Sequence, residues 1–166
     1  MTAGMEQRAA IATYIAREAI VSAVINAAIG ALFFYGLFGG LNDVPVPGWG
    51  GYAFDFLPQS AAVTLMACLV PGLLARRALA AGRWRLPQNE VPALPYLLRL
   101  AALSVAVGLM LGGGSAALWI MSGIVSLGHA SALVIKIVYG ALLGALITSR
   151  VLRHLLRDTL SSKDMN

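Results

Sequence analysis

The sequence predicts an all-α integral membrane protein, a bundle of four transmembrane helices. Hydrophobic residues make up 59% of the 166 residues and charged residues 11%, against about 45–50% and about 25% in soluble domains. Four apolar stretches each approach the roughly 20 residues with which a helix crosses the hydrocarbon core. Nearly all basic residues lie between these stretches or at their ends. We therefore expect residues 1–166 to form a single transmembrane domain.

The first span is predicted at about residues 19–38, where the glycines at 39 and 40 end it. Residues 5–17 combine good helix formers with charges and contain no Gly or Pro. They either lie along the membrane surface or extend the first span. The apolar stretch is longer than that of a signal peptide, so we expect an uncleaved helix.

An outer loop is predicted at residues 39–58. Its prolines and glycines exclude a long regular element, and its aromatic side chains suit the depth of the lipid headgroups. These aromatic residues are Trp49, Tyr52, Phe54 and Phe56. Pro58 fits the first turn of the second span, at about 59–75, because its missing N–H costs nothing there.

A basic, proline-containing connector follows at residues 76–96. The third span is predicted at about 97–121 and the fourth at about 131–149, joined by a short turn. The tail, residues 150–166, begins as a basic amphipathic helix and lies on the inner side.

The basic residues predict the orientation. Eleven of the 12 lie in the N-terminal segment, in the connector with the first turn of the third span, or in the tail. Because cytoplasmic segments of membrane proteins are enriched in Lys and Arg, both termini are expected in the cytoplasm. The expected location is the bacterial inner membrane.

Small or polar residues recur at every fourth position of each span. Such ladders let helix backbones approach closely in lipid, so we interpret them as packing surfaces. The alternative is that part of one ladder lines a polar cavity. The four ladders are Glu18/Ser22/Asn26/Gly30, Ser60/Thr64/Cys68/Gly72, Ser104/Gly108/Gly112/Ala116 and Ala132/Lys136/Gly140/Gly144/Thr148.

Polar residues at similar depths predict a network inside the membrane. Its expected members are Glu18, Ser22, Asn26, Ser104 and Thr148. Glu18 lies near the inner boundary, where pairing with an arginine is the preferred role and proton coupling the alternative. Asn26 is eight residues further, about 12 Å deeper, and needs a partner on another helix.

Lys136 is the basic residue that falls inside a span. It lies about 8 Å into the fourth span from the outer side. Its side chain either reaches the outer headgroups or forms a buried ion pair with Asp55, a carboxylate at the same level.

Arginines near the cytoplasmic side are expected to contact anionic lipid headgroups, each contributing about 1 kcal/mol. They are Arg76, Arg77, Arg83, Arg85, Arg150, Arg153 and Arg157.

The residue pattern argues against an enzyme. We find no catalytic triad, no paired carboxylates at one depth and no phosphate-binding loop, so no catalytic or cofactor site is expected. Cys68 is the one cysteine, and His129 and His154 are isolated, so no metal site is expected. Nucleic acid is rejected because no basic, aromatic-rich surface segment exists. We expect a permease- or channel-like unit that acts as an oligomer; the alternative is an accessory or scaffold subunit of a larger membrane complex.

Overall fold

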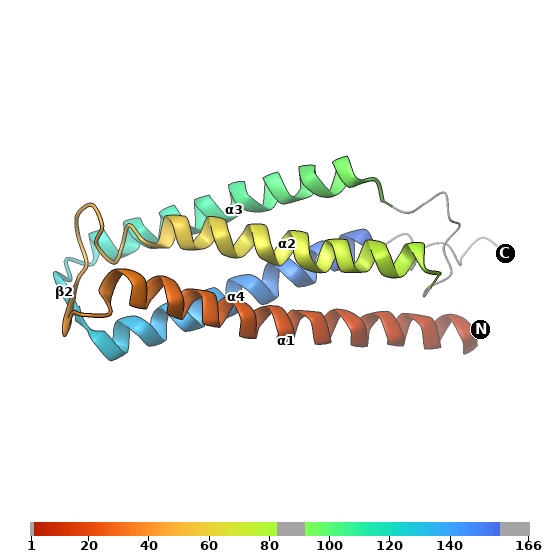
Figure 1. The fold of residues 1–166 in the computed structure, drawn as a ribbon, viewed down its shortest axis with the longest axis horizontal. Coiled ribbons are helices and arrows are strands. Elements are labelled where there is room, and N and C mark those ends of the chain that lie inside the picture. The colour runs from red at the N-terminus through yellow and green to blue at the C-terminus, as the bar shows by residue number, and fades with distance from the viewer. Residues whose placement is uncertain (1, 83–91, 157–166) are drawn as a thin grey trace.

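The computed structural model describes residues 2–82 and 92–156, in which it contains four long helices (Figure 1). Each is long and apolar enough to cross a membrane, so the prediction of four such helices is confirmed. They are α1 (Thr2–Phe38), α2 (Phe56–Ala80), α3 (Leu94–Met121) and α4 (His129–Leu155).

The helices extend past the ends of the predicted spans. With 37 residues α1 is about 55 Å long, and it includes the charged segment 5–17 as a direct continuation of the span. Similarly, α2 continues through Pro71 to Ala80, and α4 reaches Leu155. A helix need not end where its apolar stretch ends, because the Ala-, Leu- and Arg-rich flanks are good helix formers.

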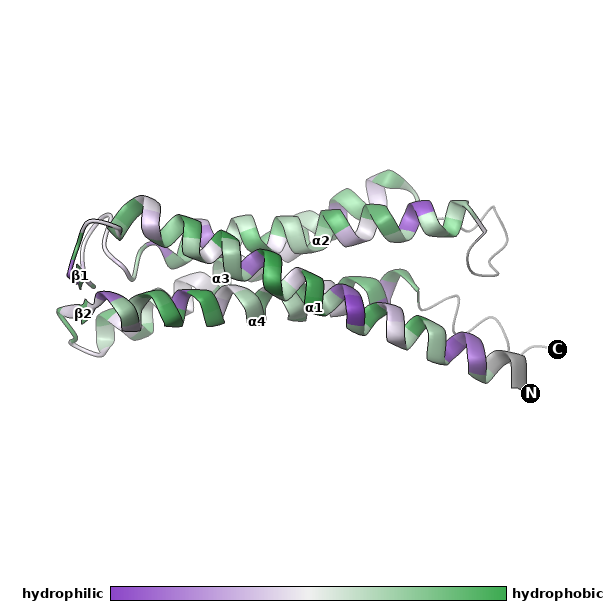
Figure 2. Ribbon diagram, turned by 60° about the horizontal axis from the view of Figure 1, so that its bottom comes forward, coloured by the Kyte–Doolittle hydropathy of each residue, from purple (hydrophilic) through white to green (hydrophobic). Residues whose placement is uncertain are grey.

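The helices form two antiparallel pairs. α1 packs along α4, and α2 packs along α3. The pairs are joined chiefly by contact between α2 and α4, whereas α1 and α2 touch only slightly. Figure 2 shows the two layers from the side, with hydrophobic residues along most of the length of the helices.

A short antiparallel sheet closes one end of the bundle and was not predicted. Strand β1 (Asp43–Pro45) pairs with β2 (Ser126–Gly128), and Val44 lies opposite Leu127. The N–H of His129 also donates to the carbonyl of Asn42 at 3.0 Å. The sheet joins the two interhelical loops at this end. Strands of three residues are too short to give the sequence a recognisable alternation.

The core is divided into three clusters along the bundle. The cluster beneath the sheet is rich in aromatic residues, and it includes Phe34, Phe38, Tyr52 and Phe56, all at most 2% exposed. The middle and far clusters are mainly aliphatic. Polar groups buried at the loop end of the bundle are therefore surrounded mainly by aromatic side chains.

Candidate functional site

Three polar side chains meet between α1 and α4. The hydroxyls of Ser22 and Thr148 are hydrogen-bonded to each other at 2.7 Å. The Thr148 hydroxyl also lies 2.9 Å from the carbonyl oxygen of Ala67 on α2, within hydrogen-bonding distance. The amide nitrogen of Asn26 donates to the carbonyl and hydroxyl of Ser22 at 2.8 and 3.0 Å. All three side chains are buried. The polar contacts thus connect α1, α2 and α4 at one level.

Glycines allow α1 and α4 to approach closely beside these residues. A Cβ atom added to Gly140 would lie 2.7 Å from the carbonyl oxygen of Asn26, and one added to Gly30 would lie 3.0 Å from that of Lys136. At Gly144 an added Cβ would collide with the Asn26 amide. No side chain fits at these contacts, so the two backbones pass each other directly.

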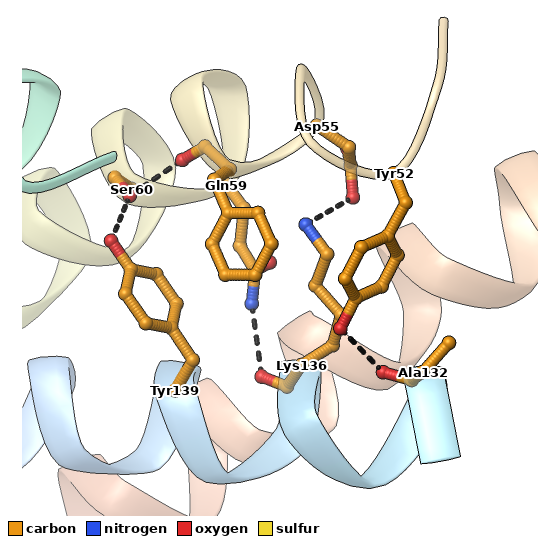
Figure 3. A network of polar contacts seen from close by, with 8 residues as sticks. Tyr52, Asp55, Gln59, Ser60, Ala132, Lys136 and Tyr139 are labelled. Atoms are coloured by element: carbon orange, nitrogen blue, oxygen red, sulfur yellow. Dashed lines mark hydrogen bonds and ion pairs between the residues drawn. The ribbon is translucent and has the colours of Figure 1, made fainter. Parts of the chain in front are cut away.

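An ion pair between α4 and the start of α2 is buried at the loop end of the bundle (Figure 3). The ammonium of Lys136, on α4, lies 2.9 Å from Oδ2 of Asp55, the residue that precedes α2. The side chains are 0% and 2% exposed. The structure therefore brings together the two residues that the sequence proposed as a pair, and Lys136 does not extend outward to the headgroups.

Aromatic rings surround the ammonium. It lies 3.6 Å from the ring centroid of Phe56 and 4.9 Å from that of Tyr52. Cation–π attraction of this kind is strongest where the cation is desolvated, as here. Lys136 is therefore held by one carboxylate and two ring faces.

Polar residues that were not among the expected members of the network complete this region, and Ser60 was expected only in a packing ladder. Nε2 of Gln59, which is 0% exposed, donates to the carbonyl of Lys136 at 3.2 Å. The hydroxyls of Ser60 and Tyr139 lie 2.6 Å apart and join α2 to α4. Gln59 follows Asp55 by four residues and so shares its helix face. This four-residue spacing is the feature of the sequence from which Gln59 could have been predicted as a neighbour of Asp55.

Tyr52 anchors the loop to α4 through a hydrogen bond from its hydroxyl to the carbonyl of Ala132, at 2.9 Å. Burial, together with the nearby charge of Asp55, holds the pKa of the Tyr52 hydroxyl well above its ordinary value of 10. Above about pH 10 the folded protein keeps a proton that the unfolded chain releases, so this residue's contribution to stability falls as pH rises.

We expect Tyr52→Phe to leave the tyrosinate absorbance change of the folded protein between about pH 9 and 11 unchanged, because Tyr52 stays protonated there. Alkaline titration of the wild type and the variant measures this. After unfolding in detergent, the absorbance change of the wild type on alkaline titration should exceed that of the variant by the amount expected for one tyrosine. A smaller absorbance change in the folded variant would contradict the expectation.

Three acceptor oxygens in these two regions are buried with neither a hydrogen-bond partner nor an ion-pair partner among the described residues. They are Oδ1 of Asn26, Oε1 of Gln59 and Oδ1 of Asp55. Because Nε2 of Gln59 lies near Gly30 and Gly140, which adjoin Asn26, the two regions are neighbours along α4. We call this set, Ser22, Asn26, Asp55, Gln59, Lys136 and Thr148, the polar seam.

The expected network is only partly assembled. Ser104 does not join it, because α3 packs against α2 rather than α1. The Ser104 hydroxyl donates instead to the carbonyl oxygen of Leu100 on its own helix at 2.9 Å. Glu18 is half-buried at the end of the seam and lines a groove between α1 and α2.

The arginines assigned to lipid contact lie on α2 and α4 far from the sheet. Arg77, Arg150 and Arg153 are exposed and Arg76 is half-buried. Arg83, Arg85 and Arg157 lie outside the described residues.

Within residues 2–82 and 92–156, no three His, Cys, Asp or Glu side chains gather in a metal-binding arrangement. Comparison of the chain with protein-family models, curated proteins and solved structures found no match to any of them.

Proposed function

We propose that the protein is a non-enzymatic transport unit, permease- or channel-like, that acts as an oligomer in the bacterial inner membrane. One observation carries the proposal: the polar seam holds buried acceptor oxygens of Asn26, Asp55 and Gln59 that have no partner among the described residues. A buried polar group without a partner costs free energy, in lipid above all. Acceptors of this kind would be satisfied by a solute, an ion or water that enters the seam.

The charges support an orientation with both termini in the cytoplasm. The described arginines lie on the parts of the helices far from the sheet, and the loops at the sheet end, residues 39–55 and 122–128, contain no Lys or Arg. Cytoplasmic segments attract such basic residues, which there contact anionic headgroups. Close approach through the small-residue ladders then drives the helices together in the bilayer.

The proposal includes an oligomer because the helix pairs are tightly packed. Small residues already make the α1–α4 contacts and leave little room for a continuous aqueous route inside one subunit, so a route that includes the polar seam would have to be completed between subunits. A route between subunits needs faces that can associate. The outward face of α3 offers large apolar side chains, among them Met110, Leu118 and Met121, at 77%, 71% and 83% exposure.

The same face of α3 favours a second candidate, an accessory subunit that binds helices of a larger complex. Crosslinking in native membranes separates the two candidates. Dominant crosslinks between copies of this chain are expected for the transport unit, whereas crosslinks to one unrelated membrane protein would indicate the accessory subunit.

Transport is tested with the purified full chain in proteoliposomes on a solid-supported membrane. Concentration jumps of protonated amines, inorganic cations, anions and zwitterions are applied in turn. We expect a transient current with one of these classes, reduced at least about fivefold by Gln59→Met, which removes a seam acceptor at similar side-chain volume. Ser115→Ala is the control, because Ser115 is a half-buried residue of α3, outside the polar seam, whose hydroxyl donates to the carbonyl of Leu111 on its own helix. Absence of current with every class would contradict the proposal.

A further inference from the structure

A groove between α1 and α2 opens where these helices barely touch. Its volume is about 300 Å³, at the lower end of the range of small-molecule sites. Apolar side chains of α2, Met66, Val70, Pro71 and Leu74, form one wall. The α1 wall carries the polar residues Glu18, Ser22 and Asn26.

Asn26 offers the groove an acceptor. The residue is 2% exposed, and its Oδ1 has no hydrogen-bond partner in the described part of the chain. The orientation of the amide is determined by its neighbours, because the atom 2.8 Å from the Ser22 carbonyl must be the nitrogen. The oxygen is therefore a buried, unpaired acceptor on a residue that lines the groove.

Glu18 offers a negative charge at the other end of the groove. Within residues 2–82 and 92–156 the ion pair found is that of Asp55 and Lys136, so the carboxylate of Glu18 has no basic partner there. Glu18 precedes Asn26 by two helical turns, which separates them by about 12 Å. The acceptor and the charge thus mark the two ends of an apolar groove.

We propose that this groove binds an elongated amphipathic amine, with its ammonium at Glu18, its hydrocarbon body against α2 and a hydrogen-bond donor at Asn26. The inference rests on the proposed transport function and names its substrate class. The carboxylate selects a cation, the apolar wall of α2 selects a hydrocarbon body, and the free amide oxygen selects a ligand with a donor at the far end.

The probe is an eight-carbon amino alcohol with its amino group and hydroxyl at opposite ends. Octylamine lacks the distal donor and octanol lacks the charge, so these two compounds test each end without altering the protein. Equilibrium dialysis against the full chain in nanodiscs, with empty nanodiscs as the blank, measures binding. We expect one saturable site, with the amino alcohol bound about tenfold more tightly than either analogue.

Glu18→Gln keeps the side-chain shape and should weaken binding of the amino alcohol about tenfold, while Glu6→Gln, a change at an exposed position of the same helix, should not. Absence of saturable binding above the empty-nanodisc blank, equal binding of all three compounds, or equal affinity of Glu18→Gln and wild type would overturn the inference. Saturable binding with no current in proteoliposomes would contradict the transport function and leave the site standing. If another solute class produces a current and the amino alcohol does not bind, the amine site is overturned and the transport function stands.

Discussion

Replacing Lys136 with Met should lower the free energy of unfolding by about 3–5 kcal/mol, the cost of leaving a buried charge without its partner. The variant removes the ammonium that lies 2.9 Å from Asp55 and keeps a flexible side chain among the rings of Tyr52 and Phe56. Asp55, which is 3% exposed in the wild type, then has no cation to balance its charge. Reversible unfolding by sodium dodecyl sulfate in mixed micelles measures the loss.

The double variant Asp55→Asn with Lys136→Met is the control. Removing both charges of a buried pair is often neutral, because the desolvation cost of each ion disappears with the attraction between them. We expect the double variant to recover most of the stability that Lys136→Met loses. A double variant as unstable as Lys136→Met would show that the packing of the lysine side chain, rather than its charge, holds this end of the bundle.

The pair could be predicted because depth in a membrane follows from sequence position. Lys136 and Asp55 both lie near the beginnings of helices that start at the same end of the bundle, so their levels agree whatever the lateral order of the helices. The four helices were predictable for a similar reason, since length and composition alone indicate a membrane span. Both predictions use only the position along the membrane normal.

Lateral order was not predictable in this way. Ser104 has a suitable depth for the network, yet it faces α2, because α3 is the helix furthest from α1. Ladders of small residues occur in all four spans, and their pattern does not specify which ladder meets which. The partners of Ser22 and Thr148 became clear only from the structure, where the ladder of α1 lies against that of α4.

The glycines at 112–114 of α3 are a second case in which the sequence does not specify which residue makes the contact between helices. Three consecutive glycines in a helix are compatible with either a close crossing or a pliable point, and their pattern does not rank the three positions. A Cβ atom at Gly112 would lie 2.6 Å from the carbonyl oxygen of Phe56, whereas one at Gly113 would make an ordinary contact and one at Gly114 would meet nothing within 4 Å. The structure therefore places the close crossing with α2 at Gly112.

Gly112→Ala should accordingly destabilise the protein by about 1–3 kcal/mol, because α2 and α3 must move apart to admit the methyl group. Gly114→Ala is the matched control: it makes the same chemical change two residues away, and it should be neutral or stabilising by up to about 1 kcal/mol through helix propensity. Unfolding in mixed micelles compares the two variants directly. Equal stability would show that α3 adjusts at no cost near Gly112, and the glycines would then act as a pliable segment rather than a close crossing.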